Sequence, residues 1–275
     1  MARTNIRSTR VKPASGGLLV LNVLRRERIS ANFARVTLGR GDIDRFKPMG
    51  YDQWFRLFLP VGGGSLAKVP KRLDMVSYLR FLTVSKNVRP VLRNYSVRAY
   101  RPDGPEGPEL DVDVVLHGSP DDGTAGPASA WAQTCRPEDP VAILDEGIGF
   151  NPPPGTRHVV LVADETGLPA VAGILDSLPH DARGHAIVEI PDEADRQELT
   201  GPPGVTVDWL PRATTGLPAG QFAYREAIGL RLPQEPTYGW VVGEQALATG
   251  VRRHWVASGL PKDNIMFCGY WRAQP

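Results

Sequence analysis

NPPPGTRHVVLVA, residues 151–163, is the stretch that decides the fold, because the character of the chain changes inside it. Proline fixes its own backbone angle and lacks an N–H donor, so Pro152–Pro154 can continue neither a helix nor a central strand. The apolar run His158–Ala163 lacks the alternation of a half-buried strand and is typical of a strand covered on both faces of a parallel sheet. We therefore expect two domains, residues 1–150 and residues 151–275, joined at the prolines.

Downstream of the prolines, strand-like and helix-like segments alternate to the end of the chain. The expected strands are 158–163, 185–190, 205–210, 238–242 and 264–268, and the expected helices are 168–178, 222–230 and 245–258. Alternation of this kind implies right-handed crossovers and an open parallel sheet of the nucleotide-binding type.

Upstream of the prolines, six segments have apolar residues at the two-residue period of a strand with one buried face. They are 18–23, 34–38, 53–59, 94–100, 110–116 and 141–144. These segments predict a six-stranded antiparallel barrel, so the fold class is a β barrel followed by an α/β domain. Residues 62–91 form a long excursion to which the sequence assigns neither a structure nor a role.

The formal net charge of +2 conceals an uneven distribution along the chain. Residues 1–100 hold 20 Lys and Arg against 5 Asp and Glu, whereas residues 101–275 hold 12 against 25. This asymmetry predicts that the N-terminal region attracts anions. The basic residues of segment 1–15 are expected to belong to a frayed tail rather than to an arm that binds nucleic acid or membrane.

The two cysteines, Cys135 and Cys268, lie far apart and lack metal-ligand spacing, so neither a disulfide framework nor a metal site is expected. The sequence shows no secretory signal and no apolar run of roughly 20 residues. These features predict a cytoplasmic protein with no stable membrane association and no nucleic-acid partner.

Two short motifs of the first domain carry candidate binding chemistry. Arg93-Asn94-Tyr95-Ser96 combines a planar cation that suits phosphate oxygens with a flat ring that suits another flat ring, although these residues are also ordinary on an exposed strand. Gly126-Pro127-Ala128-Ser129 leads into an expected short helix, whose free N–H groups suit a pyrophosphate. The alternative is an ordinary capped helix, with Ser129 as the cap and Trp131 in the core.

An antiparallel barrel that precedes a nucleotide-type parallel sheet, with these motifs in place, resembles the flavin reductases of the ferredoxin-reductase kind. More narrowly, the chain resembles the siderophore-interacting protein family of ferric-siderophore reductases. The matching segments are Arg93–Arg98, Leu116–Gly118, Gly126–Ala132, Ala163–Ala170, Trp240–Glu244, Arg252–Arg253 and Gly269–Arg272. The resemblance runs from about residue 18 to residue 272 and is weakest between residues 60 and 92.

The resemblance implies bound FAD, with Arg93 at its pyrophosphate, Tyr95 against the flavin ring and Ser96 near the reactive nitrogen of the flavin. It extends the cofactor-binding set to Val97, Arg98, His117, Gly118, Gly126, Pro127, Ala128, Ser129, Trp131, Asp164, Glu165, Thr166, Gly243, Glu244, Tyr270 and Trp271. No catalytic side chain and no protein metal site are implied, because the flavin carries the redox chemistry.

The resemblance also implies reduction of iron(III) held in a ferric siderophore, with release of iron(II). Electrons would pass through FAD from NADH, NADPH or a ferredoxin. Glu189 and Asp192 favour a donor with a free ribose hydroxyl, whereas Arg196 would suit a 2′-phosphate, so the donor stays open. Arg56 and Arg272 are candidate contacts for an anionic siderophore.

Two residues depart from the family pattern: Ala163 stands where glycine is usual, and Gly167 stands where alanine is usual. If the glycine allows a close approach of the nicotinamide, Ala163 weakens dinucleotide binding. Two alternatives to a siderophore reductase therefore stay open. One is a flavin reductase that serves a protein electron acceptor, and the other is a non-catalytic siderophore-binding protein, which Ala163 would favour.

Overall fold

The computed structural model describes residues 4–14, 16–60 and 89–273, together with residues 66, 69, 81, 83 and 85. Most of the unassigned stretch 62–91 lies outside these residues. The chain forms two compact units that are discontinuous in sequence. The barrel unit comprises Lys12–Met49 and Gln53–Gly147, and the α/β unit comprises Met1–Val11, Gly50–Asp52 and Ile148–Pro275.

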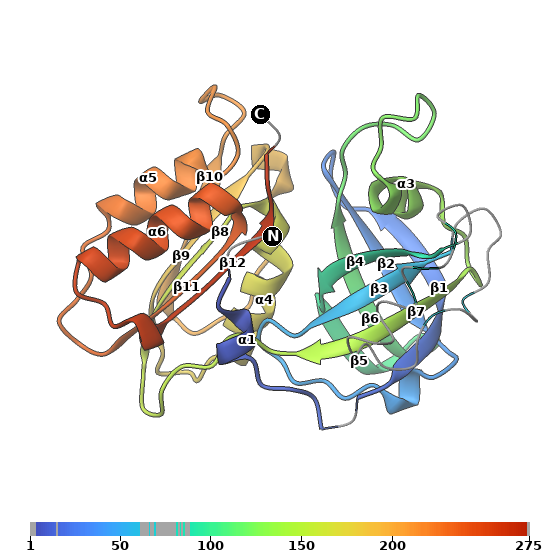
Figure 1. Cartoon of the computed structure of the whole chain (residues 1–275), viewed down its shortest axis with the longest axis horizontal. Coiled ribbons are helices and arrows are strands. Elements are labelled where there is room, and N and C mark those ends of the chain that lie inside the picture. Colours follow the sequence, from blue (N-terminus) through green and yellow to red (C-terminus); the bar gives the residue numbers. More distant parts are fainter. Residues whose placement is uncertain are drawn as a thin grey trace. The chain divides into compact units, whose positions relative to one another are not determined.

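The barrel unit contains a curled sheet of seven strands in which every pair is antiparallel (Figure 1). The order across the sheet is β4-β3-β7-β1-β2-β6-β5. The strands are β1 Leu18–Arg28, β2 Phe33–Gly39, β3 Trp54–Leu59, β4 Val91–Ser96, β5 Ala99–Gly104, β6 Gly107–Val115 and β7 Pro140–Gly147. One helix, α3 (Pro127–Thr134), follows β6, and a short 3-10 turn, Ile43–Arg45, follows β2.

The two edge strands of this sheet, β4 and β5, are consecutive in the chain and separated by Val97 and Arg98 alone. The Val97 N–H donates to the Gln53 carbonyl beside β3 at 2.8 Å, and the Arg98 N–H donates to Asp111 in β6 at 2.9 Å. Since adjacent residues reach opposite edges, the sheet must curl into a barrel. The barrel is confirmed, but its predicted count of six strands is wrong, because apolar alternation continues through the break and made 94–100 look like one strand.

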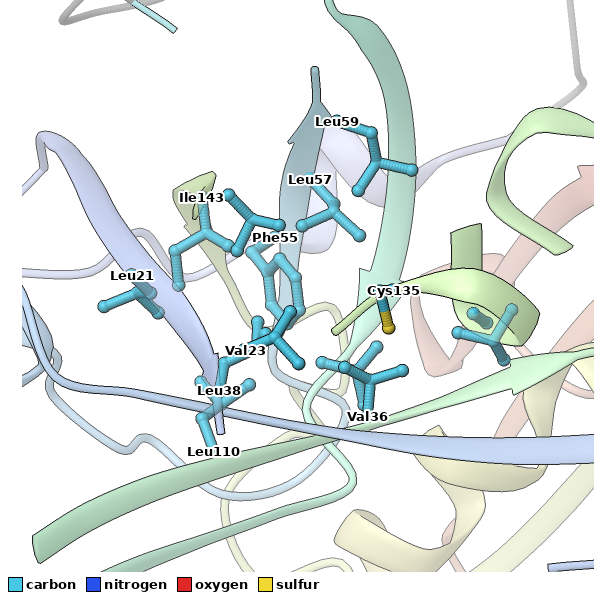
Figure 2. Packing of buried hydrophobic residues seen from close by; sticks show 14 of the residues in the cluster. Leu21, Val23, Val36, Leu38, Phe55, Leu57, Leu59, Leu110, Cys135 and Ile143 are labelled. Carbon is cyan, nitrogen blue, oxygen red and sulfur yellow. The ribbon is translucent and has the colours of Figure 1, made fainter. Parts of the chain in front are cut away.

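The barrel core consists of the inward residues of its strands, joined by Cys135 just after α3. In β6, Leu110, Val112 and Val114 are fully buried and belong to one core cluster with residues of the other strands. Figure 2 shows Leu110 in this cluster with Leu21, Val36, Leu38, Phe55, Leu57 and Ile143. The alternation that predicted this strand therefore has the expected cause, which is one face turned to the core.

The outward residues of β6 are also buried, because arginines from neighbouring strands cover them. We call Glu109, Asp111 and Asp113 the β6 carboxylate row. Salt bridges of 2.7 Å join this row to Arg25 at Glu109, to Arg35 at Asp113 and to Arg101 at Asp111. The barrel thus has an ionic layer outside its apolar core.

The α/β unit contains five parallel strands in the order β10-β9-β8-β11-β12. They are β8 His158–Ala163, β9 Arg183–Ile190, β10 Gly204–Pro211, β11 Thr237–Glu244 and β12 Ile265–Trp271. The helices α5 (Gln221–Gly229) and α6 (Gln245–Ala257) cover one face and α4 (Leu168–Ser177) the other (Figure 1). Right-handed crossovers require this division, because the chain leaves β8 in one direction and returns past it to β11. All five expected strands and all three expected helices are confirmed.

The N-terminal segment belongs to the α/β unit. Thr4 forms an antiparallel bridge with Cys268 in β12, and the Asn5 side chain bonds Ile265 O at 2.7 Å and Phe267 N at 2.9 Å. A four-residue helix, α1 (Ile6–Thr9), follows. The expectation of a frayed tail is therefore wrong for residues 4–11, because a single asparagine side chain satisfies backbone groups at the sheet edge.

Residues 50–52, which connect β2 to β3, also join the α/β unit. The Tyr51 ring stacks on Phe150 at 5.3 Å between centroids. The buried Asp52 carboxylate accepts hydrogen bonds from Gly149 N at 2.9 Å, Phe150 N at 2.8 Å and Trp240 Nε1 at 2.9 Å. This carboxylate ties the short insertion to the start of the segment that leads into β8.

Charge is shared between the units more evenly than along the chain. The barrel unit has 19 Lys and Arg against 15 Asp and Glu, a net +4, and the α/β unit has 13 against 15, a net −2. The strongly basic first hundred residues are offset by acidic residues of β6, β7 and their loops, which fold into the same unit. We therefore expect the folded barrel unit to attract anions less strongly than the charge of residues 1–100 predicts.

Cys135 and Cys268 are both free thiols. Among the described residues, no group of three or more His, Cys, Asp and Glu side chains is placed to hold a metal ion. None of the helices in the described ranges has the length and hydropathy that a membrane crossing requires.

Candidate functional site

The predicted flavin strand is β4, and its pairing with β3 fixes where its side chains lie. Tyr95 lies opposite Phe55, and Ser96 lies opposite Trp54. Because residues directly opposite in an antiparallel pair share a face, the Tyr95 ring packs against the barrel core beside Phe55. Burial raises the pKa of Tyr95 to about 12, so its phenol stays neutral. Arg93, two residues earlier on the same face, is exposed.

The start of α3 presents backbone donors. Gly126 is the N-cap and has no side chain with which to cap the helix, and Ala130 N–H makes the first helical bond, to Gly126 O at 2.8 Å. The N–H groups of Ala128 and Ser129 precede this bond and have no acceptor within the helix. Pro127 at the first helical position has no N–H to satisfy. The alternative interpretation is wrong about Ser129, which lies inside the helix and is not its cap, but right about Trp131, which packs against the barrel core. The anion cradle stays a prediction.

His117 and Gly118 lie against the start of α3. A Cβ on Gly126 would lie 2.6 Å from Cε1 of His117, so only glycine lets the imidazole pack there. The buried Ser129 hydroxyl accepts from His117 N and donates to His117 O, both at 3.0 Å. Gly118 has φ +66, which glycine adopts without strain. The structure therefore brings the Leu-His-Gly motif and the α3 motif together, and it commits the Ser129 hydroxyl to the protein.

Two buried indole donors lie beside β4. Nε1 of Trp54 and Nε1 of Trp131 have no hydrogen-bond partner among the described residues. Trp54 lies opposite Ser96, and Trp131 is in α3, which packs against β4. Buried donors are nearly always bonded in proteins, so these two are available to a ligand acceptor. The open helix start, the exposed guanidinium, the flat ring and the two donors fit FAD, which has an anionic pyrophosphate and acceptors on its ring.

Two further predicted contacts, Arg98 and Arg56, are engaged by carboxylates. Arg98 lies 3.5 Å from Asp113 of the β6 carboxylate row, and Nε of Arg56 lies 2.6 Å from Glu146. Val97 is buried in the barrel core. The Arg56 charge is thus partly neutralised inside the protein, and its assignment to a siderophore stays a prediction.

In the α/β unit, the predicted residues Asp164, Thr166, Glu244 and Trp271 converge at the carboxyl end of β8. One Asp164 oxygen accepts from Thr166 N at 2.9 Å and Thr166 Oγ1 at 2.5 Å. The other accepts from Glu244 N at 2.6 Å and Trp271 Nε1 at 2.8 Å. Burial and the neighbouring charge of Glu165 raise the pKa of Asp164 to about 7.

Gly243 makes room for this carboxylate. Its φ is +122, and a Cβ there would lie 2.5–2.7 Å from the carboxylate atoms of Asp164. Glu244 then caps α6, accepting from the N–H of Ala246 and, at 3.4 Å, from that of Leu247. The Trp-x-x-Gly-Glu motif is therefore a strand end shaped around Asp164 followed by a helix cap.

Glu165 belongs to a second cluster, whose other members the sequence did not reveal as partners. Arg212, just after β10, bonds both Glu165 oxygens at 2.6 Å and Glu189 at 3.3 Å. Glu189 is fully buried at the end of β9 and also accepts from Gly220 N at 2.7 Å and Ala223 N at 2.9 Å. The adjacent carboxylates of Asp164 and Glu165 thus link the carboxyl ends of all five parallel strands.

The residues expected to distinguish the two nicotinamide donors are engaged locally. Glu189 is committed to Arg212 and α5, so it is not placed to meet a ribose. Asp192 caps the 3-10 turn Glu193–Asp195 in a reciprocal capping box, and Arg196 pairs with Glu193 at 2.8 Å. The expected role of Glu189 is wrong, because the acidic residue that ends this strand points into the protein.

The two departures from the family pattern meet in space. A Cβ on Gly167 would lie 2.7 Å from Cβ of Ala163 and 2.5 Å from Cγ2 of Val242. The methyl group of Ala163 thus uses the room that Gly167 leaves. Ala163 has no positive φ and lies inside β8. A packing exchange therefore accounts for alanine at position 163, and the effect of Ala163 on dinucleotide binding stays a prediction.

The closing motif ends β12. Tyr270 and Trp271 are half-buried, and the Trp271 indole bonds Asp164 as described above. Arg272 is exposed just after the strand, with its side chain at the surface.

Comparisons with known proteins place both halves in one family. Residues 22–148 match the siderophore-interacting FAD-binding domain, and residues 156–274 match the siderophore-interacting protein model. An uncharacterized protein of Mycobacterium tuberculosis is 30% identical over 71% of this chain and 65% of its own length, so the chain spans less than two thirds of that relative.

Two other relatives match almost end to end. The NADPH-dependent ferric-chelate reductase of Escherichia coli is 27% identical over 92% of each chain. The crystal structure of a siderophore utilization protein from T. fusca is 28% identical, with a TM-score of 0.74 over 97% of each chain.

Proposed function

Because the chain belongs to the siderophore-interacting protein family, we propose that it reduces iron(III) in ferric siderophores and releases iron(II), with FAD as its redox group. Both halves match family domains, and the E. coli relative carries the name of a ferric-chelate reductase. The observation that supports this best within the chain is the open start of α3 beside β4 with its two unpartnered indole donors. FAD, when bound, supplies the electron-transfer chemistry.

In this proposal the barrel unit holds the cofactor. The N–H groups of Ala128 and Ser129 and the guanidinium of Arg93 bind the pyrophosphate, because each is a donor that the protein leaves exposed or open. The Tyr95 ring packs on the flavin, and the Ser96 hydroxyl lies near its reactive nitrogen. The surrounding shape comes from Val97, Arg98, His117, Gly118, Gly126, Pro127 and Trp131.

The α/β unit receives the electron donor in this proposal. Asp164, Glu165, Thr166, Gly243 and Glu244 shape the carboxyl edge of the sheet, where α/β folds bind dinucleotides. Tyr270 and Trp271 end the adjoining strand. Arg272 of this unit and, separately, Arg56 of the barrel unit are each candidate contacts for an anionic siderophore. NADPH is the preferred donor, supported by the name of the E. coli relative, with NADH or a ferredoxin as alternatives. We place this activity in the cytoplasm, supported by two free thiols.

One anaerobic titration tests the proposal. Purified protein should show flavin absorbance that bleaches with NADPH and returns when a ferric siderophore is added, while a chelating dye reports iron(II). A colourless protein that takes up no FAD would contradict the whole proposal. Tight siderophore binding with a flavin that no donor bleaches would instead establish the non-catalytic siderophore-binding protein. Return of the flavin colour only with a protein acceptor would establish the flavin reductase that serves such an acceptor.

A further inference from the structure

The buried Asp164 carboxylate lies at the point where the strand order reverses. β8 is followed in the sheet by β9 and β10 on one side and by β11 and β12 on the other. In open α/β sheets, ligands bind in the crevice at the carboxyl ends of the strands that flank this reversal. Asp164 directly follows β8 and Gly243 is the second-last residue of β11, so both lie at that crevice.

Trp271 is bonded across this position. Its indole belongs to β12, the edge strand beyond β11, yet its Nε1 donates to Asp164 at the end of β8. The same Asp164 oxygen accepts from Glu244 N, so one atom joins the ends of three strands. A large ring on the last residues of a strand would otherwise be free to adopt several rotamers.

We propose that Asp164 is a positioning residue for Trp271, whose indole it fixes at the strand reversal so that the nicotinamide of the electron donor meets a preset aromatic surface. The consequence for the nicotinamide rests on the proposed function. The hydrogen bond that holds Trp271 is independent of that function, because it is measured without electron donor or siderophore.

The hold is strongest when the carboxylate is ionised. Protonation of Asp164 makes the oxygen that faces Trp271 either a donor or a neutral acceptor, and hydrogen bonds to a charged acceptor are roughly twice as strong as those to a neutral one. The charged groups around it are Glu165 on its own turn, Glu244 of β11 and Arg212 beyond β10. Since burial raises this pKa above the ordinary value of an aspartate, the hold is complete well above neutral pH and weakens as the pH falls through about 7.

Indole N–H resonances of the 15N-labelled, FAD-loaded protein test the contact directly. The chain has six tryptophans, and Trp271→Phe identifies the resonance of Trp271. We expect this resonance to shift downfield with rising pH, with a midpoint near neutrality, and to lose that titration in Asp164→Asn. Asp208→Asn, an exposed carboxylate on β10, should leave it unchanged. A Trp271 resonance that is the same in wild type and Asp164→Asn overturns the proposal.

Flavin bleaching by NADPH tests the consequence. Asp164→Asn and Trp271→Phe should each lower the limiting bleaching rate roughly tenfold, since small misplacements of reacting groups have effects of this size. The double variant should be no slower than either single variant, because the two residues act as one unit. Additive losses would overturn the positioning role. If wild type does not bleach at all, the proposed function fails, and the resonances still decide the contact.

Should Asp164→Asn fail to fold, the pH titration of the wild-type Trp271 resonance decides the contact alone. A resonance that does not move between about pH 9 and about pH 3 contradicts the proposal, because this range covers both the raised pKa of Asp164 and the ordinary pKa of an aspartate.

Discussion

Ala163 and Gly167 exchange sizes at a single packing contact. This chain has the methyl group on the strand, at Ala163, and the glycine on the turn, at Gly167, the reverse of the pattern that it resembles. Only one of the two positions can carry a methyl group without strain, because Cβ atoms at both would lie 2.7 Å apart.

This exchange predicts non-additive stability. Gly167→Ala should destabilise the protein by about 1–3 kcal/mol through overpacking, and adding Ala163→Gly should restore part of that loss, because Val242 must still rotate away. Urea unfolding followed by tryptophan fluorescence measures both. Gly229→Ala is the matched control, since a Cβ there meets open space. Equal stability of Gly167→Ala and Gly229→Ala would contradict the packing account.

Arg93 carries the prediction for the cofactor. Its guanidinium is exposed on the same face as Tyr95 and is free of a salt bridge among the described residues, unlike Arg56 and Arg98. Arg93→Ala should weaken FAD binding roughly 10- to 100-fold, the range for one lost charge-assisted hydrogen bond. Fluorescence titration of the apoprotein measures this, with Arg45→Ala as the control. Unchanged affinity would remove Arg93 from the pyrophosphate.

Among the elements, β6 has an ionic layer that should dominate acid sensitivity of the barrel. Hydrogen bonds from Arg25, with a further bond from Arg101, lower the pKa of Glu109 to about 2. A carboxylate whose pKa is depressed on folding stabilises the protein above its unfolded pKa and loses that contribution as the pH falls toward its folded pKa. The window for Glu109 is therefore about pH 4.5 down to about pH 2.

Glu109→Gln tests this layer. The variant should lose about 1.5–3 kcal/mol at pH 7, since a hydrogen bond to a charged group contributes that much, and the difference from wild type should shrink steadily below about pH 4.5. Urea unfolding at several pH values measures the difference. Glu106→Gln, whose carboxylate is partly exposed beside Arg40, serves as the control and should show a smaller loss. A loss that is the same at pH 7 and at about pH 2 would contradict the ionic origin.

Periodicity predicted the elements well because each element buries a face that its own residues define. The strands of the α/β unit and the barrel strand β6 follow from local pattern alone. The break at Val97 and Arg98 does not, because what ends β4 is bonding to residues 44 and 13 positions away, Gln53 and Asp111. Local sequence contains no signal for partners at such separations.

The sequence motifs of the candidate site could be predicted, but the contacts between their residues could not. Asp164, Glu244 and Trp271 stand in separate motifs, and only the strand order brings them onto one carboxylate. Arg212 was missed because its partners Glu165 and Glu189 end two other strands. An arginine directly after an expected strand was the available signal, and it is a weak one until the order of the strands is known.

At the scale of the whole molecule, the distribution of charge changes the expected approach of the substrate. A net +4 on the barrel unit attracts an anionic siderophore only moderately, because seven arginines among its described residues form salt bridges within the unit: Arg25, Arg35, Arg40, Arg45, Arg56, Arg98 and Arg101.

The rate at which the reduced protein is reoxidised by an anionic ferric siderophore should therefore fall less than about threefold between about 20 mM and about 200 mM salt. Stopped-flow absorbance measures this rate. A neutral ferric chelate provides the control and should show almost no change. A fall of tenfold or more for the anionic chelate would show that the basic residues act together on the substrate.

The three residues Gly50–Asp52 have a consequence for recombination between relatives. A chimera made by one crossover at the proline linker would combine Asp52, Gly149 and Phe150 of one parent with Trp240 of the other. An exchange in which the first parent lacked the carboxylate would leave the Trp240 indole buried without an acceptor, at a cost of about 1–3 kcal/mol. The halves of this family are therefore inherited most safely with three junctions, so that the tripeptide travels with the sheet whose tryptophan it binds.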